Sequence, residues 1–194
     1  MRNKEYINRG DRPTKNGFGD GLAEAGRNHP ELLALGADIT GSVGMNLFAE
    51  EFPDRFYSLG IAEQNCIGVA AGMALSGKIP VFATYGVFAA LRTTDFIRIS
   101  VCYNDLHVVI GGAHAGISVG PDGATHQALE DIAIMRCLPN MTVLSPCDAT
   151  QTRLAMLAAV EQHKGPVYLR FGRAPVPDFS PVDDEFTIGE AQQL

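Results

Sequence analysis

Residues 66–91 read CIGVAAGMALSGKIPVFATYGVFAAL, the most apolar stretch of the 194-residue chain. The stretch is long enough for a membrane span, but Lys78 and Pro80 interrupt it and glycines are scattered through it. A buried helix over 62–75 followed by a buried strand over 79–83 fits this composition better. A helix that leads directly into an apolar strand is typical of a parallel sheet with covered faces.

The same alternation of helix and strand continues on both sides of this stretch. The expected strands are continuous apolar runs, as in sheets that are buried on both faces. The sequence therefore predicts an α/β fold in three layers, a mostly parallel sheet flanked by helices on both faces. Expected helices cover 13–28, 62–75, 89–102, 126–136 and 149–162; expected strands cover 32–35, 55–59, 79–83, 106–110, 141–144 and 166–171; a glycine-rich loop covers 111–125.

Length and composition suit one globular domain with a sizeable core, since 46% of the residues are hydrophobic. The net charge of −7 argues against a nucleic-acid partner or an anionic membrane surface. The N-terminus has no apolar run typical of a signal peptide, so we expect a cytoplasmic location. We expect a loose arm over 1–12, the domain over 13–173, and a linker over 174–194 toward a C-terminal domain absent from this sequence.

Polar and aromatic side chains follow the ends of the expected strands. In an open parallel sheet, ligands bind outside the carboxyl ends of the strands. The sequence therefore predicts a polar site with an aromatic platform along that edge. The residues expected there include Asp38, Ser42, Glu63, Tyr85, Phe88, His114, Asp122, His126, Asp148, Arg170 and Arg173.

Two segments carry a family pattern. Residues 57–65 read YSLGIAEQN, and residues 120–127 read GPDGATHQ, with His114 lying 12 positions before His126. The first segment resembles the glutamate motif of the transketolase central domain. The second resembles that family's G-x-D-G-x-T/S-H-Q segment. Over roughly 13–173, the chain is thus similar to the pyrimidine-binding domain of a thiamine-diphosphate enzyme.

The resemblance implies thiamine diphosphate as the cofactor. In this family the cofactor's aminopyrimidine takes the proton from the thiazolium carbon, and a glutamate bound to a ring nitrogen drives the required tautomer. Glu63 matches this glutamate, and Tyr85 and Phe88 match the aromatic pair around the pyrimidine ring. Asp38 matches an aspartate near the cofactor, and Ile39 matches the residue that holds the cofactor bent.

The resemblance also implies substrate-binding residues. His114 and His126 match histidines that contact a sugar and can move protons near neutral pH. Asp122 matches an aspartate that reads a substrate hydroxyl. Ser42 and Arg173 match positions that hold a sugar phosphate in some members, a task that suits the guanidinium fork.

Three features leave the match incomplete. Arg170 is as good a phosphate ligand as Arg173 on sequence alone, and Leu91 stands where full-length transketolases often have another aromatic residue. Gly19-Asp20-Gly21 resembles the opening of the family's magnesium motif, but it lies inside an expected helix and lacks the paired asparagines. We therefore expect no metal ligand in this chain. The resemblance implies that a partner diphosphate-binding subunit binds Mg²⁺ or Ca²⁺.

The function implied is that of a transketolase-type transferase of the pentose phosphate pathway, which moves two-carbon ketol units between sugar phosphates. The chain would be inactive alone and active in a homo- or hetero-oligomer with its partner. A 1-deoxyxylulose-5-phosphate synthase is the nearest alternative, although that family carries arginine at the position of His114. The β subunit of a 2-oxoacid dehydrogenase fits residues 120–127 poorly. A non-catalytic assembly module of the same fold is the alternative from another class.

Overall fold

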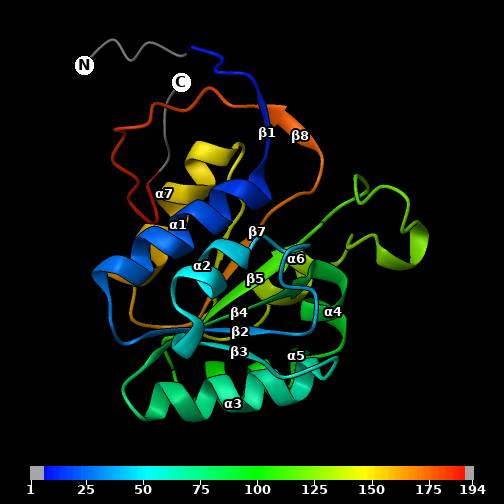
Figure 1. Cartoon of the computed structure of the whole chain (residues 1–194). Coiled ribbons are helices and arrows are strands. Elements are labelled where there is room, and N and C mark those ends of the chain that lie inside the picture. Colours follow the sequence, from blue (N-terminus) through cyan, green and yellow to red (C-terminus); the bar gives the residue numbers. More distant parts are fainter. Residues whose placement is uncertain (1–6, 191–194) are drawn as a thin grey trace.

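Within residues 7–190, the part of the chain that the computed structural model describes, six parallel strands form one sheet (Figure 1). The strand order is β3-β2-β4-β5-β7-β6, and every neighbouring pair is parallel. The predicted α/β fold with a mostly parallel sheet is thereby confirmed. The strands are β2 (Leu32–Gly36), β3 (Phe56–Ser58), β4 (Ile79–Tyr85), β5 (Val109–Ala113), β6 (Thr142–Leu144) and β7 (Val167–Arg170).

Helices cover both faces of this sheet. Successive side chains of each strand point to opposite sides, so each face has its own buried cluster. In β4, Val81 and Ala83 belong to one buried cluster and Phe82 belongs to the other. The first face is covered by α1 (Thr14–Asn28), α2 (Asn46–Glu51) and α7 (Ala149–Glu161) (Figure 1). The second is covered by α3 (Glu63–Leu75), a π-helical turn (Ile97–Cys102) and α6 (Asp131–Arg136). The short helices α4 (Gly86–Leu91) and α5 (Thr94–Phe96) follow β4.

The apolar stretch 66–91 divides as predicted, into the rest of α3, the strand β4 and then α4. Among the described residues, none of the helices has the length and apolar character needed to cross a membrane.

Glycines let α1 approach its neighbours closely. A Cβ atom at Gly17 would lie 1.9 Å from the carbonyl oxygen of Ala149 in α7. A Cβ atom at Gly19 would lie 2.3 Å from the carbonyl oxygen of Gly44. The triplet Gly19-Asp20-Gly21 thus lies inside a packed helix, as the sequence predicted.

The strand β5 differs from its predicted bounds of 106–110. It covers Val109–Ala113, so the first three residues of the expected glycine-rich loop belong to the sheet. A Cβ atom at Gly112 would lie 2.0 Å from the hydroxyl oxygen of Tyr168, which is fully buried on β7. Glycine here makes room for a large neighbouring side chain in the sheet and does not mark a loop.

Two expected helices are shorter than predicted. The helix over 89–102 is interrupted, and the hydroxyls of Thr93 and Thr94 donate to backbone carbonyls four residues earlier. Such threonine bonds bend helices. The helix over 126–136 begins only at Asp131, because Ala128 pairs with Gly116 in an antiparallel bridge.

Segments near the two ends of the chain pair in a small antiparallel ribbon of β1 (Asp11–Pro13) and β8 (Pro175–Pro177). Asp178 follows the ribbon and is only 1% exposed. Its carboxylate accepts hydrogen bonds from the backbone N of Thr150 at 3.0 Å and from the Thr150 hydroxyl at 3.2 Å. Arg12 pairs with the same carboxylate at 3.4 Å.

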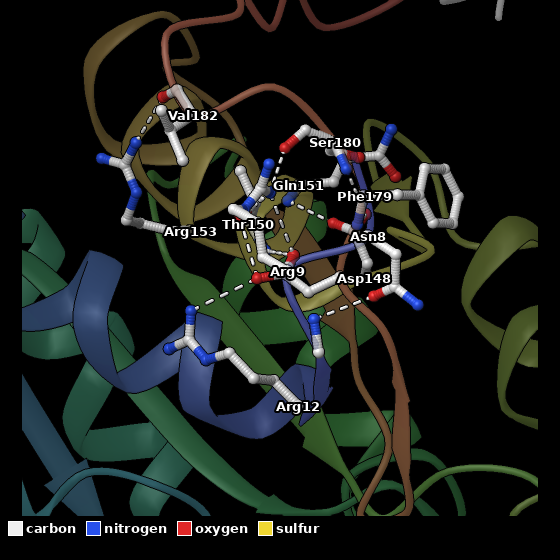
Figure 2. A network of polar contacts seen from close by, with 12 residues as sticks. Asn8, Arg9, Arg12, Asp148, Thr150, Gln151, Arg153, Phe179, Ser180 and Val182 are labelled. Carbon is white, nitrogen blue, oxygen red and sulfur yellow. Dashed lines mark hydrogen bonds and ion pairs between the residues drawn. The ribbon is translucent and has the colours of Figure 1, made fainter. Parts of the chain in front are cut away.

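A second buried carboxylate, Asp148, caps α7 and holds the segment after the ribbon (Figure 2). It accepts hydrogen bonds from the backbone N of Gln151 at 2.8 Å, of Phe179 at 3.1 Å and of Ser180 at 2.8 Å. Parts of the expected arm and linker are therefore bonded to the start of α7. The division into arm, domain and linker stays a prediction, and residues 1–6 and 191–194 of it lie outside the described range.

We expect Gly17→Ala to lower the free energy of unfolding by about 3 kcal/mol, because the added methyl group must push α1 away from α7. Gly68→Ala in α3 is the matched control, since no atom lies within 4 Å of a Cβ at that position. Alanine is favoured over glycine inside a helix by roughly 1 kcal/mol, so this variant should be as stable as the wild type or more so. Urea unfolding measures both, and equal losses would contradict the close approach of α1 and α7.

Candidate functional site

The predicted site lies where the winding of the sheet reverses. The chain runs from β2 to β3 on one side and then to β4 on the other side of β2. Such a switch point leaves a crevice outside the carboxyl ends of the strands, where ligands bind in sheets of this kind. Ser42 follows β2, Tyr85 ends β4, and His114 follows β5 directly.

Tyr85 is the centre of a cluster of rings. It stacks on His114 with ring centroids 4.6 Å apart, and its centroid lies 5.8 Å from that of Phe88. His126 lies edge-on to both aromatic rings, with centroids 5.8 Å from Tyr85 and 5.3 Å from Phe88. The Tyr85 hydroxyl is 2.9 Å from the hydroxyl of Ser42. The structure thus joins five predicted site residues in one network of contacts.

A closed loop brings the two histidines together. The chain between them leaves the sheet edge as the yellow-green excursion in Figure 1. Gly116 and Ala128 pair at its base, where the Gly116 N–H donates to the Ala128 carbonyl at 2.9 Å. This bridge spans the same 12 positions that separate His114 from His126. The spacing recognised in the sequence is therefore the length of a loop that returns to its starting point.

His114 is held neutral and fixed. It is 1% exposed, and its Nε2 lies 3.0 Å from the backbone carbonyl of Ser42. A carbonyl can only accept, so Nε2 carries the proton and Nδ1 is left as a buried acceptor without a partner among the described residues. Burial lowers the pKa of His114 to about 4. Its φ of 53° is unusual for a residue other than glycine, and such strain collects at functional sites.

Glu63 begins α3 and is 5% exposed. Its carboxylate accepts a hydrogen bond of 3.0 Å from Arg92, whose guanidinium carbon lies 3.8 Å over the Phe88 ring. Arg92 thereby connects the glutamate to the ring cluster. Glu63 and Arg92 line a cavity of about 520 Å³, together with Ile61, Ala62, Gln64, Asn65 and Leu91.

The two candidate phosphate ligands have different partners. Arg173 pairs with Asp122 at 3.0 Å and donates to the carbonyl of Val119 at 2.9 Å. Arg170 instead pairs at 2.9 Å with Asp131, which is 1% exposed. Arg173 is therefore in contact with another predicted substrate residue, whereas Arg170 compensates a buried charge.

Asp38 and Ile39 lie in the turn after β2, apart from this network of contacts. Asp38 is exposed with a φ of 65°, and within residues 7–190 its side chain makes no hydrogen bond or ion pair with the other predicted residues. Ile39 is partly buried against the core cluster of the first sheet face. Their predicted contacts with the cofactor stay predictions.

Sequence reasoning missed two cations near the site. Arg92 lies four residues after Phe88, a spacing that places two helical side chains on one face and could have revealed it. Lys15 on α1 donates to the Ser42 carbonyl at 3.4 Å, and no rule about strand ends would have found it. Among the described residues, no group of three or more histidine, cysteine, aspartate or glutamate side chains could hold a metal ion.

The geometry agrees with comparisons to known proteins. A family model of the transketolase pyrimidine-binding domain matches residues 11–178. The chain belongs to this family. A provisionally named transketolase C-terminal section of Methanocaldococcus jannaschii is 43% identical over 182 residues, covering 93% of this chain and 57% of that protein.

Two further matches of this transketolase-family chain are a solved structure and a synthase. A solved structure described as a split-gene transketolase, inactive β4 tetramer, has a TM-score of 0.83 and 46% identity, covering 93% of this chain and 58% of that one. A 1-deoxy-D-xylulose-5-phosphate synthase of Carboxydothermus hydrogenoformans is 39% identical over 91% of this chain and 28% of its own length. The chain thus spans just over half the length of the first two matches.

Use of thiamine diphosphate is a property of the family, and the residues present suit its pyrimidine ring. Tyr85 and Phe88 offer flat apolar surfaces to an aromatic heterocycle. Glu63 offers a buried carboxyl group beside a cavity, where it can bond to a ring nitrogen through a proton. His114 Nδ1 is an acceptor still without a partner in the described chain, and a ligand hydroxyl would satisfy it.

We expect His114 to make the protein less stable in acid. The unfolded chain takes up this proton near the ordinary pKa of 6.5, whereas the folded protein does so only near pH 4. The stability from this group is therefore complete above pH 6.5 and is lost as the pH falls toward 4, by about 3 kcal/mol in total. Urea unfolding at several pH values should show a shallower acid slope for His114→Asn than for the wild type. Identical slopes for His114→Asn and the wild type would contradict the assignment.

Proposed function

We propose that the chain is the pyrimidine-binding half of a thiamine-diphosphate-dependent transketolase. It transfers a two-carbon ketol unit from sugar phosphate donors to aldose acceptors, in an oligomer with a partner subunit that binds the diphosphate and Mg²⁺ or Ca²⁺. The observation that carries the proposal is the buried Glu63, which Arg92 connects to the Phe88 ring at the carboxyl edge of the sheet. The match to a split-gene transketolase supports the need for a partner.

Bound thiamine diphosphate supplies the nucleophilic carbon that makes and breaks carbon–carbon bonds next to a carbonyl. The carboxyl group of Glu63 holds a ring nitrogen of the pyrimidine. Tyr85 and Phe88 hold the flat ring, and Asp38 and Ile39 contact the rest of the cofactor beyond β2. The exclusion of water from Glu63, which is 5% exposed, strengthens its hydrogen bond to the ring.

The two histidines have different tasks in this proposal. His126 is half-buried, and its Nδ1 lies 2.8 Å from the Thr125 hydroxyl, which leaves Nε2 to exchange a proton with a substrate oxygen. His114 cannot release its Nε2 proton without breaking its bond to the Ser42 carbonyl. It therefore acts through Nδ1, as a fixed acceptor for a substrate hydroxyl.

A sugar phosphate fits the outer part of the site. Arg173 presents a guanidinium fork, the group best suited to a phosphate, and Ser42 provides a hydroxyl. Asp122, which pairs with Arg173 at 3.0 Å, accepts a hydrogen bond from a sugar hydroxyl. The ion pair of Arg170 with Asp131 favours Arg173 as the phosphate ligand.

A 1-deoxyxylulose-5-phosphate synthase remains the second candidate, because such a synthase is 39% identical over most of the chain. His114 at a position where that family carries arginine favours transketolase. A non-catalytic module would have no use for a buried glutamate beside a cavity. Cytoplasmic location and a place in pentose phosphate metabolism belong to the same proposal.

We expect ketol transfer only when this chain is mixed with a diphosphate-binding transketolase subunit, thiamine diphosphate and Mg²⁺. Glu63→Gln should lower kcat in that mixture at least a hundredfold, the usual scale for loss of a proton-handling group. Glu50→Gln, an exposed carboxyl change, should leave kcat unchanged. A sugar-transfer assay measures all three. Full activity of Glu63→Gln, or transfer by the chain without a partner, would contradict the proposal.

A further inference from the structure

Arg92 contacts both groups to which the proposed function assigns the pyrimidine ring. Its guanidinium carbon lies 3.8 Å over the Phe88 ring, and its Nη1 donates to Glu63 Oε1 at 3.0 Å. These are the two surfaces that the proposed function assigns to the cofactor, an aromatic face and a buried carboxyl group. Arg92 and Glu63 both line the cavity of about 520 Å³.

The remaining surroundings of Phe88 are already taken by other rings. Tyr85 stacks on it with centroids 5.8 Å apart, and His126 lies edge-on at 5.3 Å. A pyrimidine that stacks on Phe88 therefore competes for the face that Arg92 covers. A guanidinium is flat and rich in N–H donors, so it can cover Phe88 and donate to the Glu63 carboxylate. A flat nitrogen heterocycle can take the same two places when a proton lies between its ring nitrogen and the carboxyl group.

The same contact compensates the charge of Glu63. A carboxylate that is 5% exposed is costly without a partner, and Arg92 provides the opposite charge. Arg92 itself is 47% exposed in its side chain, and among residues 7–190 its guanidinium has no hydrogen bond except that to Glu63. If Arg92 moves into solvent, Glu63 is therefore the only group that needs a new hydrogen-bond partner among the described residues.

We propose that Arg92 is an internal plug of the pyrimidine site, which holds Glu63 and Phe88 in the empty chain and is displaced when the cofactor enters. This inference rests on the proposed function, because it assumes that the pyrimidine binds to these two residues. Cofactor binding is then an exchange of partners on Glu63: Arg92 leaves, the carboxylate takes up one proton from solvent, and that proton bonds it to the ring nitrogen. The plug therefore lowers the affinity of the chain for the ring.

The test uses the purified chain and a small pyrimidine probe, 4-amino-5-hydroxymethyl-2-methylpyrimidine, followed by ligand-observed NMR in buffer of neutral pH, so that a proton is available for the hydrogen bond between the carboxyl group and the ring nitrogen. Arg92→Ala should bind the probe about tenfold more tightly than the wild type, and Arg92→Lys should lie between them, because lysine keeps the charge without the flat fork. Raising NaCl from about 0.05 to about 0.5 M should bring the wild-type affinity toward that of Arg92→Ala, since salt weakens a half-exposed ion pair. A residue with only a structural role would not produce this salt dependence.

Arg98→Ala is the matched control, because Arg98 is exposed and lies outside the cavity that Glu63 lines. It should bind the probe as the wild type does, and Glu63→Ala should abolish binding. Equal binding by the wild type and Arg92→Ala, lost in Glu63→Ala, would overturn the plug and leave the proposed function intact. No Glu63-dependent binding in either the wild type or Arg92→Ala would overturn the pyrimidine site itself.

Discussion

Burial of the sheet on both faces is the constraint on which the rest of the structure depends. The central strands are apolar along most of their length, as β4 shows with Val81 and Ala83 on one side and Phe82 on the other. Polar groups therefore gather mainly where these strands end. The reversal of winding between β2 and β4 opens that edge, so the fold itself collects Ser42 and His114 around Tyr85.

The same constraint explains which parts could be predicted. Helix α3 and strand β4 followed from apolar runs and their breakers, because those signals are local. The bounds of β5 did not, because Gly112 is fixed by Tyr168, which lies far along the chain. A glycine chosen for a distant partner cannot be distinguished from a loop glycine without knowing that partner.

The site shows a similar division. The histidine spacing was readable because it is the length of one closed loop, which the bridge between Gly116 and Ala128 ties at its base. The ion pair of Arg92 with Glu63 joins α4 to α3, and only the folded chain shows it. Asp148 follows a strand end like the site residues, yet it is used to cap α7 and to hold Phe179 and Ser180.

The polar groups of the site are largely satisfied by one another. Arg92 holds Glu63, Asp122 holds Arg173, and Ser42 holds both Tyr85 and His114. A ligand that enters such a site gains only the difference between its own contacts and those it replaces. The site therefore favours molecules that match several of these groups at once. A ligand that displaces one member of an ion pair without replacing its contacts leaves the other member as an uncompensated charge, which is costly. In that sense the internal pairs themselves make the site selective.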